Sequence, residues 1–206
     1  MNKPVIIGLT GPTGAGKSTV AANLIQCGCG VIDCDLIARE VTSNSVECIA
    51  QLCTEFGDDI IKEDGGLNRH LLAQRAFVSE QKSNKLNQIT HPFILEKIKK
   101  EISALQCSEV PAIVVDAPVL FESGANSFCN VIIAVIAPLE VRLNRIMRRD
   151  NISEELAFER INVQHSDDFY TKRADYCIDG ASNLEQIAKI VKNILNCIVG
   201  DTNEKA

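Results

Sequence analysis

Residues 11–18 carry the pattern best suited to chemistry in this 206-residue chain. They read Gly11-Pro12-Thr13-Gly14-Ala15-Gly16-Lys17-Ser18 and fit the spacing G-x-x-x-x-G-K-[ST] of a phosphate-binding loop. Glycines let backbone N–H groups turn inward and approach phosphate oxygens closely. We expect Lys17 to reach the β- and γ-phosphates of ATP, the Ser18 hydroxyl to bind Mg²⁺ and Thr19 to add a phosphate contact. A plain glycine-rich turn is the alternative, but a strand-like segment precedes the motif and a helical one follows it.

Two carboxylates, Asp33 and Asp35, follow the next strand-like segment. Ligands of open α/β sheets bind at the carboxyl ends of the strands, so we expect Asp33 to face the same crevice as the phosphate loop. There it could accept the proton of an attacking hydroxyl or hold the water shell of a metal. The alternative is an N-cap for a helix beginning near Leu36, a role that suits Asp35 better than Asp33. Arg39 could pair with either acid or reach an anionic substrate.

Two further positions have a functional and a structural interpretation. Asp116 follows the third strand-like segment and opens the run Asp116-Ala117-Pro118-Val119-Leu120-Phe121-Glu122. An acid there could hold the magnesium, or it could stabilise a turn before the proline-containing loop. His91, next to Pro92, could contact the acceptor substrate or serve the fold alone.

A basic helix is expected after Pro138. It contains Arg142, Arg145, Arg148 and Arg149, and spacings of three place the first three on one face. In a chain of formal net charge −6, such a stripe predicts a lid that closes on phosphates. Arg145, at its centre, is the candidate for the closest contact. The alternative is a solvated face paired with Asp150, Glu154 and Glu155.

Short apolar runs alternate with longer helical stretches along the chain. Runs of continuous apolar character, typical of strands covered on both faces, occupy residues 5–9, 31–32, 112–115, 131–136 and 176–178. Helices are expected over 18–26, 36–41, 46–56, 69 to about 105 with a break near His91-Pro92, 138–149, from 153, and 184–198. Residues 200–206 are expected to fray.

This alternation predicts an α/β protein with the P-loop nucleoside-triphosphate hydrolase/kinase fold. We expect a five-stranded parallel sheet flanked by helices, with a helical substrate-side insertion and a lid. The chain is expected to form a single kinase domain over residues 1–206. Its core would comprise about 1–56, 107–138 and 174–199, its helical acceptor-side region about 57–106, and its lid about 139–173.

Composition excludes several partners. The acidic net charge and the few aromatic residues argue against nucleic-acid binding. The apolar runs are too short to span a bilayer, and the N-terminus lacks the pattern of a signal peptide, so we expect a cytoplasmic protein that binds no membrane. Nine cysteines at irregular spacings are expected to be reduced thiols that serve as small apolar residues.

Taken together, these segments resemble the dephospho-CoA kinase family over about residues 5–196. The resemblance rests on Gly14–Thr19, Val31–Asp35 with Arg39, Thr90-His91-Pro92, Asp116–Glu122, Arg160-Ile161 with Gln164, and Ala174–Asp179, in the family's order and spacing. Three departures are Pro12-Thr13, in which Pro12 removes one N–H from the loop entrance, Cys34, where the family commonly has Ala, and Gly180, where the family often has Asn.

The resemblance implies ATP-dependent phosphorylation of the ribose 3′-hydroxyl of dephospho-CoA, the last step of coenzyme A synthesis. It implies that Asp33 is the base, that Lys17 and Arg145 stabilise charge, and that Gly14, Ala15, Gly16, Lys17, Ser18 and Thr19 bind the ATP phosphates. Asp35, Arg39 and His91 match acceptor-side positions. The alternatives are a nucleoside or nucleoside-monophosphate kinase and a non-catalytic nucleotide-binding switch. The oligomeric state is left open.

Overall fold

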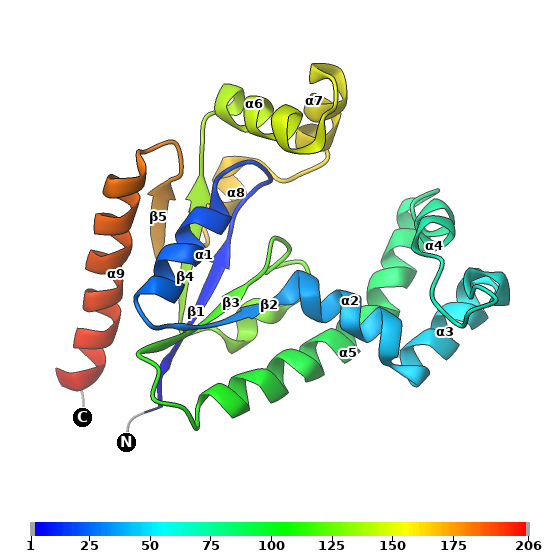
Figure 1. The fold of residues 1–206 in the computed structure, drawn as a ribbon, viewed down its shortest axis with the longest axis horizontal. Helices are drawn as coiled ribbons and strands as arrows, with labels where there is room; N and C mark the ends of the chain where they lie inside the picture. The colour runs from blue at the N-terminus through cyan, green and yellow to red at the C-terminus, as the bar shows by residue number, and fades with distance from the viewer. Residues whose placement is uncertain (1–2, 205–206) are drawn as a thin grey trace. The chain divides into compact units, whose positions relative to one another are not determined.

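The structure of the chain, a computed structural model, describes residues 3–204. Its strands are β1 (Val5–Thr10), β2 (Gly30–Asp33), β3 (Ala112–Asp116), β4 (Val131–Ile136) and β5 (Tyr176–Asp179). They form a 5-stranded sheet in the order β2-β3-β1-β4-β5, and the pairings of β1 with β3, β1 with β4 and β4 with β5 are parallel. The expected strands and the expected α/β fold class are therefore confirmed (Figure 1).

Helices connect these strands. They are α1 (Lys17–Gln26), α2 (Cys34–Asn44), α3 (Val46–Phe56), α4 (Arg69–Ala76), α5 (Glu80–Leu105), α6 (Leu139–Asp150), α7 (Glu154–Asn162), α8 (Asp167–Thr171) and α9 (Leu184–Glu204), with 3₁₀ turns η1 (Asp58–Ile60) and η2 (Ala125–Phe128). The predicted start of α7 is confirmed by its N-cap, because the Ser153 side chain accepts a hydrogen bond from the Leu156 N–H. Across residues 3–204, no helix is both long and apolar enough to cross a membrane.

Two expectations about the helices were wrong. Pro92 lies inside α5 and does not break it; the interruption falls earlier, between α4 and α5. Proline in a helix interior costs about 3 kcal/mol, and the burial of Thr90 before it and of Ile98 and Ile102 after it offsets that cost. The tail was expected to fray from residue 200, but α9 continues to Glu204; the rest of that tail, 205–206, lies outside the described residues.

The chain divides into two compact units. The first comprises residues up to Ile32 and from Ile102 onward, and the second comprises Asp33–Glu101. The second unit contains α2, α3, α4 and most of α5. Our expectation that residues 1–206 form a single kinase domain stays a prediction.

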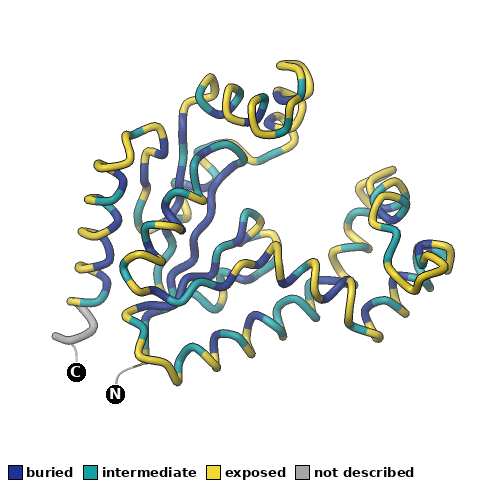
Figure 2. Tube along the Cα trace, viewed as in Figure 1, coloured by how far each residue is buried: buried dark blue, intermediate teal, exposed yellow. Residues whose placement is uncertain are grey.

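The core of the first unit lies between the sheet and two helices. Helices α1 and α9 lie side by side (Figure 1). Their Val20, Leu24, Ile187 and Val191 side chains are buried in one cluster with residues of β1, β3 and β4. The central strands are buried along most of their length (Figure 2). Because β1 lies between β3 and β4 in the sheet, the position at which the following loop begins is fixed.

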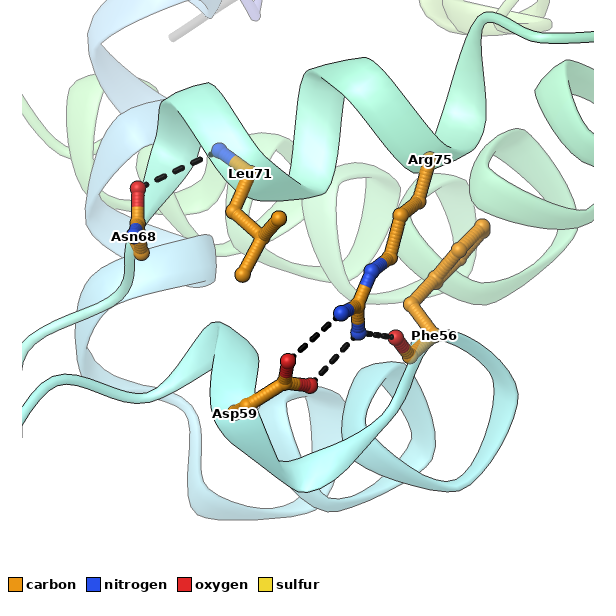
Figure 3. Close-up of polar contacts among 5 residues, drawn as sticks. All are labelled: Phe56, Asp59, Asn68, Leu71 and Arg75. Atoms are coloured by element: carbon orange, nitrogen blue, oxygen red, sulfur yellow. Dashed lines mark hydrogen bonds and ion pairs between the residues drawn. The ribbon is translucent and has the colours of Figure 1, made fainter.

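The second unit is helical and has its own buried side chains, among them Leu52, Phe56, Ile60, Leu72 and Ala76. Its corner between α3 and α4 is held by Arg75, which donates to both oxygens of Asp59, at 2.6 and 2.5 Å, and to the carbonyl of Phe56 (Figure 3). Asn68 caps α4 by accepting a hydrogen bond from the Leu71 N–H at 3.1 Å. These contacts fix the connection between α3 and α4.

Candidate active site

The phosphate-loop motif occupies the connection from β1 to α1. Gly16 is the N-cap of α1 and has φ 102° and ψ 18°, a left-handed conformation that favours glycine. The first N–H groups of α1 have no partner within the helix, and its dipole places partial positive charge at the same end. Strand, loop and helix therefore form the anion-binding arrangement that the motif predicts.

The Lys17 ammonium forms an ion pair with the Asp116 carboxylate, and both side chains are mostly buried. The sheet register explains this contact, because Asp116 at the end of β3 lies opposite Leu9, just before the loop. Neither interpretation of Asp116 anticipated the pair, which only strand order and register reveal. The contact places a carboxylate beside the cation that the motif assigns to phosphate.

Arg145 on α6 contacts the loop. Its Nη1 donates to the carbonyl oxygens of Gly14 and Ala15, each at 3.1 Å, and its Nη2 donates to the carbonyl of Gly180 at 2.7 Å. The guanidinium thus joins the phosphate loop to the residue after β5. The position of Arg145 at the loop follows from its helical spacing, whereas the contact with Gly180 had no sequence signal.

The other arginines of α6 differ from one another. Arg142 is buried and donates to the Thr13 carbonyl, whereas Arg148 is exposed. Arg149 is exposed and pairs with Asp150, as the solvated-face interpretation expected. Burial lowers the pKa of Arg142 from its ordinary value, and the negative charge of Asp167 opposes that effect. Of the three arginines in the expected stripe, Arg142 and Arg145 therefore contact the loop backbone, whereas Arg148 is exposed.

The acceptor-side candidates belong to the second unit. Asp33 is the N-cap of α2 and accepts a hydrogen bond from the Leu36 N–H at 3.0 Å. Our assignment of that cap to Asp35 was wrong, because α2 begins at Cys34, which leaves Asp35 in its first turn. Asp33, Asp35 and Arg39 are exposed, and His91 lies half-buried within α5.

The cysteines of the chain are unpaired with one another. All nine cysteines are free thiols, and Cys29, Cys34 and Cys48 are buried. Burial raises the pKa of Cys29 to about 11 and that of Cys129 to about 12, so these thiols are neutral at pH 7. Among the residues described, no group of three or more His, Cys, Asp or Glu side chains is placed to hold a metal.

Two oxygen donors beside the loop nevertheless suit a Mg²⁺ ion that binds together with substrate phosphates. Ser18 is exposed at the start of α1, and the Asp116 carboxylate pairs with Lys17 one strand away. Mg²⁺ prefers oxygen ligands and is usually bound through one or two protein groups together with substrate phosphates. Ser18 and Asp116 supply donors of that kind.

A glycine-rich loop between β1 and α1, on a sheet of order β2-β3-β1-β4-β5 and with arginines reaching its backbone, defines a P-loop kinase fold. Comparison with known proteins narrows this class. The family model described as dephospho-CoA kinase matches residues 5–186. The chain belongs to the dephospho-CoA kinase family, the enzymes of the final step of coenzyme A biosynthesis.

Individual relatives agree with this assignment. The chain is 39% identical over 189 residues to the dephospho-CoA kinase of Corynebacterium diphtheriae, covering 92% of this chain and 94% of the relative. It is 37% identical over 195 residues to that of Listeria innocua, covering 95% and 98%. Among solved structures, TT1252 from Thermus thermophilus is 32% identical with a TM-score of 0.79, covering 94% of this chain and 97% of that one.

Proposed function

We propose that this chain transfers the γ-phosphoryl group of ATP to the ribose 3′-hydroxyl of dephospho-CoA. The bond between the γ-phosphorus and the bridging oxygen breaks, a bond from the 3′-oxygen to that phosphorus forms, and CoA and ADP result. The observation that carries the proposal is an intact phosphate loop in a chain that matches the dephospho-CoA kinase family model over residues 5–186.

Two cations would stabilise the charge that spreads over the transferred phosphoryl group. Lys17, at the start of α1, and Arg145, which donates to the loop carbonyls of Gly14 and Ala15, would have this role. The backbone of Gly14–Thr19 would hold the ATP phosphates. In such reactions the protein positions the reactants and supplies electrostatic stabilisation rather than covalent chemistry.

Asp33 would take the proton of the 3′-hydroxyl as this group attacks. Its Oδ1 is held by the Leu36 N–H at 3.0 Å, which fixes the carboxylate at the end of β2. Asp35, Arg39 and His91 would bind the acceptor. An exposed arginine and an exposed carboxylate on one helix suit a substrate that carries both phosphates and hydroxyl groups.

Mg²⁺ would be held through the Ser18 hydroxyl, with Asp116 as a further oxygen donor. When bound, the metal neutralises charge on the β- and γ-phosphates. The ion pair of Asp116 with Lys17 supports this arrangement, since it keeps a carboxylate and an ammonium together where the phosphates would enter. We propose ATP and dephospho-CoA as the substrates, without nucleic-acid or membrane partners, and a cytoplasmic location.

A panel of acceptors tests the substrate assignment. The chain is incubated with MgATP and dephospho-CoA, uridine, AMP or shikimate, and ADP and the phosphorylated product are quantified. We expect turnover with dephospho-CoA only, and the phosphate on the 3′-oxygen by NMR. Turnover of another acceptor without dephospho-CoA would overturn the assignment, and nucleotide binding with no acceptor-dependent ADP release would indicate a switch.

A further inference from the structure

Thr13 of the phosphate loop is held on both sides by side chains from other parts of the first unit. Its N–H donates to Oε1 of Gln164 at 3.0 Å, and its carbonyl accepts from Nε of Arg142 at 3.0 Å. Gln164 follows α7 in the chain, and Arg142 lies on α6. Two residues far apart in sequence thus fix one peptide segment of the loop.

The two side chains also contact each other. Nη2 of Arg142 donates to the same Gln164 oxygen at 3.2 Å, and its Nη1 donates to Oδ1 of Asp167 at 3.4 Å. Each guanidinium nitrogen therefore has a protein acceptor, and the residue is only 5% exposed. A buried charge is retained only when it is paired and hydrogen-bonded, so this geometry commits Arg142 to the loop rather than to solvent or phosphate.

Backbone packing at the next residue brings the loop against α6 independently of these hydrogen bonds. A Cβ on Gly14 would lie 2.9 Å from the carbonyl oxygen of Arg142 and 3.0 Å from its Cα. Gly14 has φ 77°, a left-handed conformation. Pro12, on the other side of Thr13, has no N–H and a restricted φ. The loop entrance is thus stiff at Pro12, clamped at Thr13 and in close contact with α6 at Gly14.

We propose that Arg142, acting with Gln164, is a positioning residue that holds the phosphate loop in the conformation that receives ATP. This inference rests on the proposed function, because it assumes that the loop binds ATP phosphates. Arg142 acts through Thr13 and leaves Lys17 and Arg145 to meet the phosphoryl group. A loop already ordered by side chains loses less conformational entropy when the nucleotide binds.

Two substitutions that preserve length test the clamp. Arg142→Lys keeps the charge but loses the planar fork that reaches Thr13, Gln164 and Asp167 together. Gln164→Met keeps the length but removes the acceptor of both hydrogen bonds. We expect each variant to raise the KM for ATP, and the Kd for MgATP measured by calorimetry, by about tenfold. The KM for dephospho-CoA should change less than twofold.

Coupling between the two side chains provides a second readout. Because they share one oxygen and one peptide segment, the double variant should weaken MgATP binding no more than the more severe single variant. Lys172→Ala is the matched control, since it removes an exposed cation paired with Asp168 in the same part of the chain. This control should leave the Kd for MgATP unchanged.

The outcomes separate positioning from a purely structural role. If both variants lower the melting temperature while the Kd for MgATP stays at the wild-type value, Arg142 only joins helices, and the inference is wrong. Additive losses in the double variant would likewise contradict a shared clamp. A wild-type protein that binds MgATP but does not phosphorylate dephospho-CoA would overturn the proposed function, while the comparison of MgATP affinities would still decide the role of Arg142.

Discussion

The two units hold their candidate residues in different ways. In the first unit, Lys17, Arg142 and Arg145 all contact protein oxygens at or beside the phosphate loop. In the second unit, Asp35 and Arg39 are exposed candidates for acceptor binding. The proposed ATP side therefore consists of cations that already contact protein oxygens, whereas we expect Asp35 and Arg39 on the proposed acceptor side to be ordered by the substrate.

Two other arginines of the second unit, Arg69 and Arg75, serve its scaffold. Arg69 donates to the carbonyl of Arg39 at 2.8 Å and to the hydroxyls of Thr42 and Ser43 at 2.8 and 2.7 Å. It thereby fixes the end of α2, the helix that carries Arg39, through backbone and hydroxyl oxygens. We conclude that substitutions on the ATP side should disturb a preformed site, and substitutions on the acceptor side should remove single contacts.

The largest effect is expected at Lys17. Lys17→Ala removes a cation that stabilises the transition state and should lower kcat about 10³-fold, as loss of one preorganised donor does in other enzymes. Initial rates of CoA formation at saturating MgATP measure this effect. The substitution also leaves Asp116 mostly buried without its ammonium partner, so thermal unfolding is recorded alongside. A near-normal rate in a folded variant would contradict the role of Lys17.

The next effect is expected at Asp33, on the acceptor side. Asp33→Asn should lower kcat about 10²-fold, because an amide cannot accept the hydroxyl proton. Asparagine caps helices as well as aspartate does, so α2 should keep its N-cap and the melting temperature should stay unchanged. The Kd for MgATP should also be unchanged, in contrast to the clamp variants of the ATP side.

Unchanged turnover in Asp33→Asn would shift the base to Asp35, or to no residue at all, since a loose phosphoryl-transfer transition state needs little help from a base. Asp33→Ala sharpens this experiment. It removes both the carboxylate and the cap, so only the alanine variant should also lose stability, by about 1 kcal/mol.

Local patterns in the sequence predict much of this molecule. Continuous apolar runs predicted the five strands, and the spacing of Gly11 to Ser18 predicted the strand, loop and helix of the phosphate site. Pairings between distant segments were not predictable, because sequence spacing carries no register. Asp116 contacts Lys17 because β3 pairs with β1 in the sheet, and Gln164 accepts a hydrogen bond from Thr13 although 151 positions separate the two residues. Pro92 shows the converse, since its local preference is overridden by buried neighbours along α5.

Gly180, whose carbonyl accepts a hydrogen bond from Arg145, offers a test of the packing beside the phosphate loop. A Cβ there would lie 1.9 Å from the carbonyl oxygen of Ala15, a backbone atom that cannot turn away as a side chain would. Gly180→Ala should cost about 1–3 kcal/mol of stability, as overpacking does elsewhere. It should also raise the KM for ATP, because Ala15 lies in the loop and Arg145 donates to both carbonyls.

Gly200→Ala is the control for this substitution. Gly200 lies in α9, and a Cβ added there would meet no neighbouring side chain within 4 Å, so alanine should stabilise the helix by up to about 1 kcal/mol. Urea unfolding of both variants compares the two. Equal urea midpoints for the two variants would show that the backbone at Gly180 shifts to accept a Cβ. That result would contradict a preformed ATP side.

The smallest effect is expected at the corner of the second unit. Arg75→Ala removes the contacts with Asp59 and the Phe56 carbonyl that Figure 3 shows. The Arg75 guanidinium holds the pKa of Asp59 below its usual range. The ion pair therefore stabilises the fold at a pH above the pKa that Asp59 has in the unfolded chain. This contribution is lost as the pH falls through the lower pKa that Asp59 has in the folded chain. Since Asp59 is exposed and Arg75 is only half-buried, the melting temperature at pH 7 should fall by no more than about 3 °C. The difference from wild type should shrink further in acid, whereas the Kd for MgATP should not move, because the corner and the phosphate loop belong to different units. A change in that Kd would mean that the scaffold of the acceptor side also sets the geometry of the ATP side.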